Sequence, residues 1–317
     1  MRNLQVAIVH RLAAFVPIIL GVVFLIFVAI DLAPGDPATA SLGTFASPEQ
    51  RADFAQRHGL TDPVPIRFGR FLIEALNGEL GQSVVRSETV TAMIARAFPV
   101  TLQLTILALI IGTVSALVLG ILAALNRDGW WDRLVQVISS GAIAAPDFWL
   151  GILAIQFIAV RLGLFPSGGY VPITSGWLLW LQSMILPATV LAIPLAGSLT
   201  RLVRVSVADE LDKDYVRTAR GIGLSTQRVL GQHVLRNSAL APLTVLGIRA
   251  GQLLSGAIII EAIYTLPGLG TILIDGVRQG DLGPVRGVAI VATIAFLLIN
   301  LLIDIVYILM NPKLRQL

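Results

Sequence analysis

The side chains that could do chemistry gather in one polar segment, residues 209–242, which lies between two apolar stretches. Seven basic side chains stand in it or just before it: Arg201, Arg204, Lys213, Arg217, Arg220, Arg228 and Arg236. Four acids precede Tyr215: Asp209, Glu210, Asp212 and Asp214. Charges at this density need water, so the segment lies outside the membrane and offers a surface that a partner protein can bind.

The polar segment is predicted to fold as two helices separated by a glycine break. Asp214 is a candidate N-cap for a short helix, Tyr215–Arg220, because a carboxylate there accepts free backbone N–H groups and complements the helix dipole. Gly221 and Gly223 are predicted to end this helix, since glycine adopts the left-handed conformation without a steric penalty. Ser225 then caps a second helix that climbs toward the membrane. The result is a rigid projection on the membrane surface.

This projection resembles the cytoplasmic coupling loop of ABC-importer permeases, whose general pattern is E-A-A-x-x-x-G, followed further on by I-x-L-P. Aligned on Gly223, the chain keeps Ala219 and Leu235. It departs from the pattern at the following positions: Arg217 for Glu, Thr218 for Ala, His233 for Ile and Arg236 for Pro. These departures match the peptide/nickel branch of the family, which reads D-Y-[VI]-R-T-A-R-x-x-G-L and then H-x-L-R-N, as residues 214–224 and 233–237 do.

The resemblance implies that this segment contacts a separate ATPase subunit. The residues that it assigns to ATPase coupling are Asp214, Tyr215, Val216, Arg217, Thr218, Ala219, Arg220, Gly223 and Leu224. The plain alternative is a solvated basic loop that obeys the positive-inside rule of membrane proteins.

Composition places most of the chain in a membrane. Of its 317 residues, 56% are hydrophobic and 13% are charged, whereas soluble domains carry about 25% charged residues. The formal net charge is only +4. The basic residues lie in loops between apolar stretches, which the positive-inside rule explains without a nucleic-acid partner.

Catalysis and metal binding by this chain are not expected. It has no cysteine, so neither a disulfide nor a thiolate metal site can form. Its three histidines, His10, His58 and His233, lie outside the apolar stretches, which leaves an intramembrane hydrolase without its base. No G-x-x-x-x-G-K-[ST] and no H-E-x-x-H sequence occurs, so neither a P-loop for ATP nor a metal-ligand spacing is present.

Six apolar stretches predict six transmembrane helices and an all-α polytopic fold. They are approximately Leu12–Ile30, Phe98–Leu125, Leu134–Val160, Met184–Leu202, Leu243–Ile263 and Gly287–Leu309. Basic residues before the first stretch and within residues 201–236 put both termini and a coupling segment, residues 203–240, on the cytoplasmic side. Pro146 lies in the third stretch, and Pro187 and Pro194 predict a kink in the fourth. Residues 1–317 are interpreted as one transmembrane domain.

A long extracytoplasmic segment, residues 33–97, follows the first stretch. Ser47 and Pro48 predict the start of a helix that ends near Gly59. A second helix, Ile66–Leu76, places four apolar side chains toward one face: Phe68, Phe71, Leu72 and Leu76. Three interpretations of this stripe stay open: it lies on the bilayer, packs on the outer ends of the spans, or contacts a partner protein.

The fifth apolar stretch holds the polar residues that are candidates for a translocation path: Arg249, Gln252, Ser255 and Glu261. On a straight helix the first three fall within about 120° of arc, and Glu261 points away from Gln252. An ionisable group at membrane depth usually faces an interior or a water-filled path. Arg249 is favoured for that role, and the alternative for either charge is the membrane interface. Gly247 and Gly251 share a face that permits close helix approach.

Three further motifs extend the resemblance over nearly the whole chain. The sequence L-A-P-G-D-P-A, residues 32–38, resembles the end of the first span in B-type permeases of dipeptide and oligopeptide importers. The L-P-G-L-G turn, residues 266–270, and the C-terminal tail, residues 307–313, are also similar to this family. The chain therefore resembles a B-type permease subunit with the fold of a type I ABC importer.

The resemblance implies a non-catalytic subunit that forms half of a translocation path for di- or oligopeptides in the bacterial cytoplasmic membrane. Its implied partners are a homologous C-type permease, one or two ATPase subunits that bind ATP and Mg²⁺, and an extracytoplasmic solute-binding protein that docks near residues 33–97. No cofactor is expected on this chain itself. The substrate stays open among dipeptides, oligopeptides, nickel complexes, glutathione and haem-like ligands.

Two other classes remain as alternatives. A secondary transporter or channel would also be polytopic with buried charges, and its uptake would follow ion gradients rather than ATP. An intramembrane enzyme is the third class, weakened by the positions of the histidines.

Overall fold

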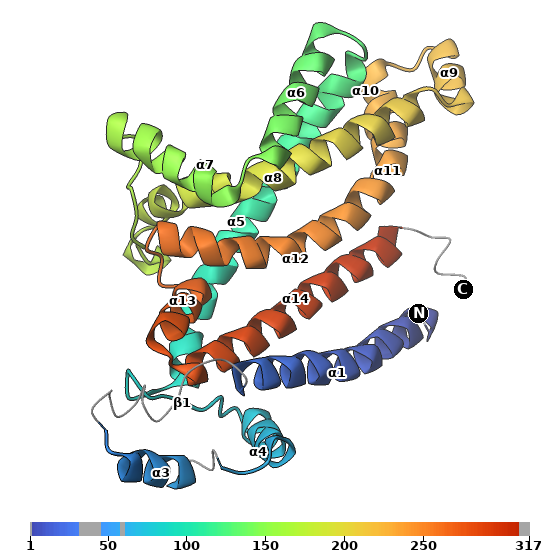
Figure 1. The fold of residues 1–317 in the computed structure, drawn as a ribbon. Coiled ribbons are helices and arrows are strands. Elements are labelled where there is room, and N and C mark those ends of the chain that lie inside the picture. Colours follow the sequence, from blue (N-terminus) through green and yellow to red (C-terminus); the bar gives the residue numbers. More distant parts are fainter. Residues whose placement is uncertain (1, 32–45, 58–60, 311–317) are drawn as a thin grey trace.

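The computed structural model describes residues 2–31, 46–57 and 61–310 (Figure 1). The helices are α1 Arg2–Asp31, α3 Pro48–Arg57, α4 Val64–Leu76, α5 Val90–Leu125, α6 Trp130–Ala144, α7 Asp147–Ala154, α8 Trp177–Leu211, α9 Asp214–Gly221, α10 Thr226–Val229, α11 Leu235–Ser238, α12 Leu240–Ile263, α13 Leu269–Gln279 and α14 Leu282–Met310. Two strands, β1 Gln82–Ser83 and β2 Glu88–Thr89, pair as a small antiparallel hairpin. The all-helical, polytopic prediction is confirmed.

Four described helices are long and apolar enough to cross a membrane: Val90–Leu125, Trp177–Leu211, Ala241–Ile263 and Leu282–Ile303. A bent pair, Trp130–Ala144 with Asp147–Arg161, raises the number to five if it forms one span. In α1 the apolar stretch Phe15–Ala29 is shorter than these. The predicted number of six spans is therefore not reproduced within the described part of the chain.

The third predicted span, Leu134–Val160, is broken rather than continuous. Its halves, α6 and the helix that begins at Asp147, are bent by 104°. Ala145 is extended, with φ −79° and ψ 128°, the conformation favoured before proline because the ring of Pro146 crowds the α conformation of the preceding residue. By contrast, α8 continues through both Pro187 and Pro194.

At several glycines, neighbouring helices approach so closely that a side chain would not fit. A Cβ at Gly120 of α5 would lie 2.7 Å from Val203 of α8. A Cβ at Gly247 would lie 2.8 Å from Ile303, and one at Gly251 would collide with the ring of Phe296. The predicted close approach along the Gly247 and Gly251 face is confirmed, and the neighbour on that face is α14.

The predicted extracytoplasmic segment contains a capped helix, α3, and a second helix, α4, which packs on α1 and α14. Ser47 and Gln50 at the start of α3 cap each other, with Gln50 N–H 3.2 Å from the Ser47 hydroxyl and Ser47 N–H 2.9 Å from the Gln50 amide oxygen. From α4, Phe68, Phe71 and Leu72 join an apolar cluster with Phe27 of α1 and with Ile290 of α14. Of the three interpretations of this apolar stripe, the structure therefore shows packing against α1 and α14.

One member of the predicted stripe departs from it, since Leu76 at the end of α4 is 87% exposed. Three predicted features lie outside the described residues: the L-A-P-G-D-P-A sequence, the helix end at Gly59, and the C-terminal tail beyond Met310. Figure 1 shows α9 at one end of the long helices and α3, α4 and β1 at the opposite end.

Candidate coupling surface and translocation face

The predicted short helix exists as α9, but its cap differs from the prediction. The helix begins at Asp214, and Lys213 is the N-cap residue, without a side-chain hydrogen bond. The backbone at Lys213 is extended, with φ −66° and ψ 146°, so the chain turns into the helix one residue earlier than predicted. Asp214 stays in the first turn, where its charge complements the helix dipole.

The predicted glycine break at Gly223 is confirmed. This residue has a φ of +87°. Its N–H donates to the Arg220 carbonyl at 3.0 Å, and the N–H of Leu224 donates to the Ala219 carbonyl at 3.1 Å. Together these bonds form a Schellman motif, which satisfies the last carbonyls of the helix and fixes its end. The next helix, α10, starts directly after Ser225, whose carbonyl accepts from the N–H of Val229 at 3.0 Å.

The two faces of α9 have different surroundings. Val216 is fully buried and Ala219 is 9% exposed, and both belong to an apolar cluster with Val203 and Val207 of α8. Asp214, Arg217, Thr218 and Arg220 are exposed. The inward face therefore anchors α9 to its own chain, and only the outward face is open to another protein. Val216 and Ala219, which the resemblance assigned to coupling, lie on the anchored face.

Tyr215 ties α9 to its neighbours on both sides. Its hydroxyl donates to Glu210 at 2.7 Å and accepts from the Asn237 amide at 3.2 Å. Burial raises the pKa of Tyr215, as does the hydrogen bond to Glu210. The phenol therefore stays neutral and keeps its proton for this bond. These contacts join the ends of α8, α9 and α11 at the base of the projection.

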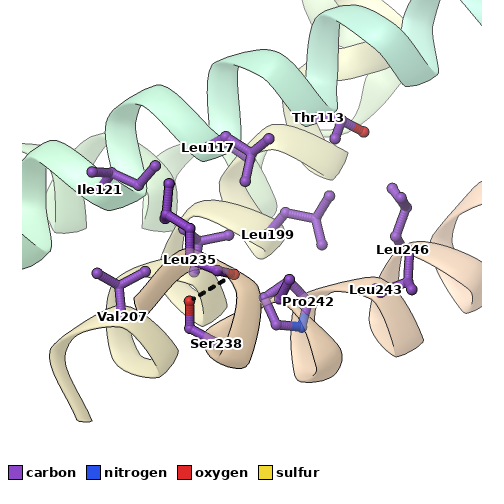
Figure 2. A pocket seen from close by; sticks show the side chains of 13 residues that line it. Thr113, Leu117, Ile121, Leu199, Val207, Leu235, Ser238, Pro242, Leu243 and Leu246 are labelled. Carbon is purple, nitrogen blue, oxygen red and sulfur yellow. Dashed lines mark hydrogen bonds between the residues drawn. The ribbon is translucent and has the colours of Figure 1, made fainter. Parts of the chain in front are cut away.

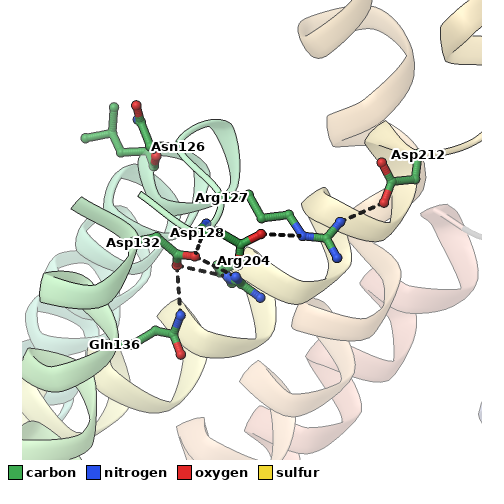
Figure 3. A network of polar contacts seen from close by, with 8 residues as sticks. Asn126, Arg127, Asp128, Asp132, Gln136, Arg204 and Asp212 are labelled. Atoms are coloured by element: carbon green, nitrogen blue, oxygen red, sulfur yellow. Dashed lines mark hydrogen bonds and ion pairs between the residues drawn. The ribbon is translucent and has the colours of Figure 1, made fainter. Parts of the chain in front are cut away.

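A buried ion pair braces the helix that leads into α9 (Figure 3). Asp132, at the start of α6, is 1% exposed and accepts from Arg204 of α8, from the Gln136 amide and from the N–H of Asp128. All of these bonds lie between 2.6 and 3.0 Å. Sequence reasoning missed this network because nothing in the local pattern links residues so distant in the chain.

A second, exposed ion pair repeats the connection closer to α9. Arg127 in the loop between α5 and α6 donates to Asp212, just after the end of α8, at 2.7 Å. The start of α6 and the loop before it are thus joined to α8 and to the residue after α8 by two ion pairs, one buried and one exposed (Figure 3). Motion of α9 would therefore also move the ends of α5, α6 and α8 that lie near it.

An apolar pocket of about 310 Å³ lies beside this braced region (Figure 2). Its walls come from α5, α8 and the segment that leads from α10 into α12, and include Leu117, Val203, Leu235 and Pro242. None of its lining residues is ionisable, so it does not suit a charged ligand. A π-helical turn, Leu230–Val234, leads into the same segment. Turns of this kind are one of the usual causes of a kink in a helix.

Three of the predicted path residues lie together on α12. The guanidinium of Arg249 donates to the Gln252 amide oxygen at 2.8 Å. Gln252 and Ser255 are exposed and Arg249 is partly buried. The predicted polar stripe therefore exists as a continuous exposed strip of the helix.

Glu261, the fourth predicted path residue, lies on the opposite side of α12 and is fully buried. Its Oε2 accepts from the N–H of Gly270 at 2.6 Å, at the start of α13. A Cβ at Gly268 would collide with the Glu261 carboxyl group. Glu261 thus caps α13 and holds the turn of residues 266–270, with Thr101 of α5 accepting from the N–H of Leu269 at 2.9 Å.

No group of three or more His, Cys, Asp or Glu side chains suited to a metal ion occurs in the part of the chain that the structure describes. What the geometry provides is a set of membrane helices with a polar strip, joined to an anchored helix that projects at one end. This arrangement is that of a polytopic membrane protein whose candidate functional parts are a polar strip and an exposed helix face.

The chain belongs to the family of binding-protein-dependent transport system inner membrane components, whose model matches residues 116–316. A second model, for the N-terminal part of such membrane components, matches residues 4–105. A protein of Brucella abortus (strain 2308) that carries the name peptide transport system permease protein is 39% identical over 97% of this chain and 98% of its own length. The glutathione transport system permease protein GsiC of Pectobacterium atrosepticum is 35% identical over 97% and 98% of the two chains.

Among solved structures, a chain of the MetNI methionine ABC transporter in an inward-facing conformation matches with a TM-score of 0.56. It is 20% identical, and the match covers 69% of this chain and 96% of that chain. The likeness shows the fold: this chain has the all-helical permease fold of a type I ABC importer. The resemblance drawn from the sequence is confirmed at the level of the family.

Proposed function

We propose that this chain is the B-type permease subunit of an ATP-driven peptide importer, and that α9 is its contact with a separate ATPase subunit. The observation that carries the proposal is the anchoring of α9. One face is buried against α8, the end is locked by the Schellman motif at Gly223, and the opposite face is exposed. A rigid helix with one free face can transmit force to the spans without unfolding.

The exposed residues of α9, together with Gly223 and Leu224, form the proposed coupling surface. Val216 and Ala219 act indirectly in this proposal, by fixing α9 to the chain. ATP and Mg²⁺ belong to one or two ATPase subunits, and this chain contributes neither a nucleotide site nor a cofactor. A homologous C-type permease supplies the other half of the path, and an extracytoplasmic binding protein delivers the substrate.

The proposed orientation follows from charge. Both termini and α9 lie on the cytoplasmic side of a bacterial inner membrane, and α3, α4 and the hairpin lie outside. Residues 1–317 form one permease domain. Peptides are the proposed substrate class, because two relatives that span nearly the whole chain are named for peptide and glutathione transport.

Within the spans, the strip of Arg249, Gln252 and Ser255 is the proposed wall of the path. Glu261 is left out of the path because its carboxyl group is buried against the turn that precedes α13.

Uptake by proteoliposomes that contain the chain and its partners tests the proposal. Uptake should require ATP on the α9 side and loaded binding protein on the other, and should survive ionophores that dissipate ion gradients. Uptake that follows an imposed ion gradient without ATP would identify a secondary transporter instead. The ligand that co-purifies with the binding protein then identifies the peptide.

A further inference from the structure

Asp147 is an ionisable residue at the break of the third predicted span. It is partly buried and stands in the first turn of α7. Its carboxylate makes no hydrogen bond or ion pair with any other residue that the structure describes. An unpaired charge among membrane helices is costly and usually faces an interior or a water-filled path.

The carboxylate faces α12 at a position where that helix has no side chain. A Cβ added to Gly256 would lie 3.1 Å from Asp147 Oδ2. Gly256 directly follows Ser255 and stands one helical turn beyond Gln252. The Asp147 carboxylate thus borders the exposed strip of α12 that also carries Arg249.

The Asp147 carboxylate and the Arg249 guanidinium lie at different heights along this strip. Seven residues separate Arg249 from Gly256, which corresponds to about 10 Å along a helix. An extended peptide spans at most about 3.5 Å per residue, so the termini of a short peptide reach about as far. The strip therefore offers an anion near one end and a cation near the other, with the Gln252 amide and the Ser255 hydroxyl between them.

We infer that Asp147 and Arg249 form a binding site for a short zwitterionic peptide on the translocation path. Asp147 receives the peptide ammonium group and Arg249 the carboxylate. The inference rests on the proposed function and deepens it, because it assigns the two ends of the substrate to named side chains. Among the described residues, neither side chain has a partner ion that it would have to leave in order to bind the peptide.

The electrostatic effect of Asp147 can be measured without knowing the natural substrate. The chain has no cysteine, so Ser255→Cys introduces a single thiol on the residue before Gly256, whose Cβ position lies 3.1 Å from Asp147 Oδ2. Its reaction with a cationic methanethiosulfonate reagent should be faster than with an anionic one by about threefold or more, because a charge within about 6 Å changes the local ion concentration by that factor even in water. Adding Asp147→Asn should remove this preference.

Ile248→Cys is the matched control on the same helix. Ile248 is 57% exposed and adjoins Arg249. This thiol should prefer the anionic reagent, and Asp147→Asn should not change that preference, whereas Arg249→Gln should remove it.

Trialanine and its N-acetylated form then test the ligand class in the complete transporter. Trialanine should slow modification of the Ser255→Cys thiol, and N-acetyltrialanine, which lacks the ammonium group, should slow it less. When Asp147→Asn is also present, the two peptides should slow the modification equally. If Asp147→Asn leaves the reagent preference unchanged, Asp147 only stabilises the start of α7 and the inference is wrong. Equal protection by both peptides would also contradict it. These thiol measurements on the chain in membranes do not depend on ATP, so their failure is distinct from failure of ATP-driven uptake.

Discussion

The carboxylate of Asp132 in α6 binds the guanidinium of Arg204 in α8 through two hydrogen bonds, 3.0 Å from Nε and 2.6 Å from Nη2. The two residues are 72 positions apart in the chain. Arg204 lies two helical turns before the end of α8, so the pair fixes α6 to the helix that leads into α9. We interpret it as the brace that makes the ends of these helices near α9 move together.

Removing the charge of Asp132 should therefore destabilise the chain. Asp132→Asn leaves Arg204, whose side chain is only 20% exposed, without its counter-ion, and losing one partner of a buried pair costs about 3 kcal/mol. The free energy of unfolding, followed by the helical circular dichroism signal in detergent, measures the effect. The control is Arg127→Gln, which breaks an exposed pair and should cost less than about 1 kcal/mol. Equal losses in the two variants would show that the buried pair is no brace.

The backbone conformation of Gly223 should be essential for coupling. Within the described chain, no atom beyond the neighbouring residues lies within 4 Å of a Cβ placed at Gly223, so a substitution there causes no clash inside the chain and acts on the backbone preference. Gly223→Val should abolish ATP-driven uptake, because a β-branched residue strongly disfavours φ near +87°. Gly223→Asn is the control and should keep most of the uptake, since asparagine tolerates the left-handed region. Normal uptake by the valine variant at normal expression would contradict the proposed role of this turn.

The two charged residues of α12 should behave differently. Arg249→Ala should slow uptake without disturbing assembly, and Arg249→Glu should slow it further, because the new charge repels a peptide carboxylate. Glu261→Gln should leave the uptake rate near the native value, since an amide oxygen can still accept from the N–H of Gly270. Uptake rates at matched expression provide the measurement. If both Arg249 variants import at the native rate, the Arg249 side chain extends to the membrane interface and does not contribute to the path.

Thiol labelling should reveal the orientation. Leu164→Cys and Gln227→Cys each place one thiol on an exposed part of the otherwise cysteine-free chain. A membrane-impermeant maleimide added to intact cells should label Leu164→Cys and leave Gln227→Cys unlabelled until the cells are opened. The reverse pattern would invert the proposed topology.

Features that depend on a few neighbouring residues could be predicted from the sequence. The cap at Ser47 and the helix end at Gly223 are set by local hydrogen bonds and by the freedom of glycine, and both are present. The position of Glu261 opposite Gln252 follows from helical geometry alone.

Features that depend on packing could not be predicted in this way. Pro187 and Pro194 stay inside α8 while the chain breaks before Pro146. All three prolines remove one backbone donor, so the difference lies in the surroundings: Pro187 is buried in the core and Pro146 is exposed. The pairing of Asp132 with Arg204 and the capping of α13 by Glu261 join segments whose contact no local pattern reveals.

Cross-linking from α9 tests the central claim most directly, namely that this helix holds the ATPase subunit. Arg217 has a 72% exposed side chain on the free face of α9. A thiol-specific photo-cross-linker attached to Arg217→Cys in the assembled, transporting complex should capture the ATPase subunit, and the same reagent on Leu164→Cys should not. If Arg217→Cys yields no ATPase adduct in a complex that hydrolyses ATP and imports peptide, α9 is not the coupling surface.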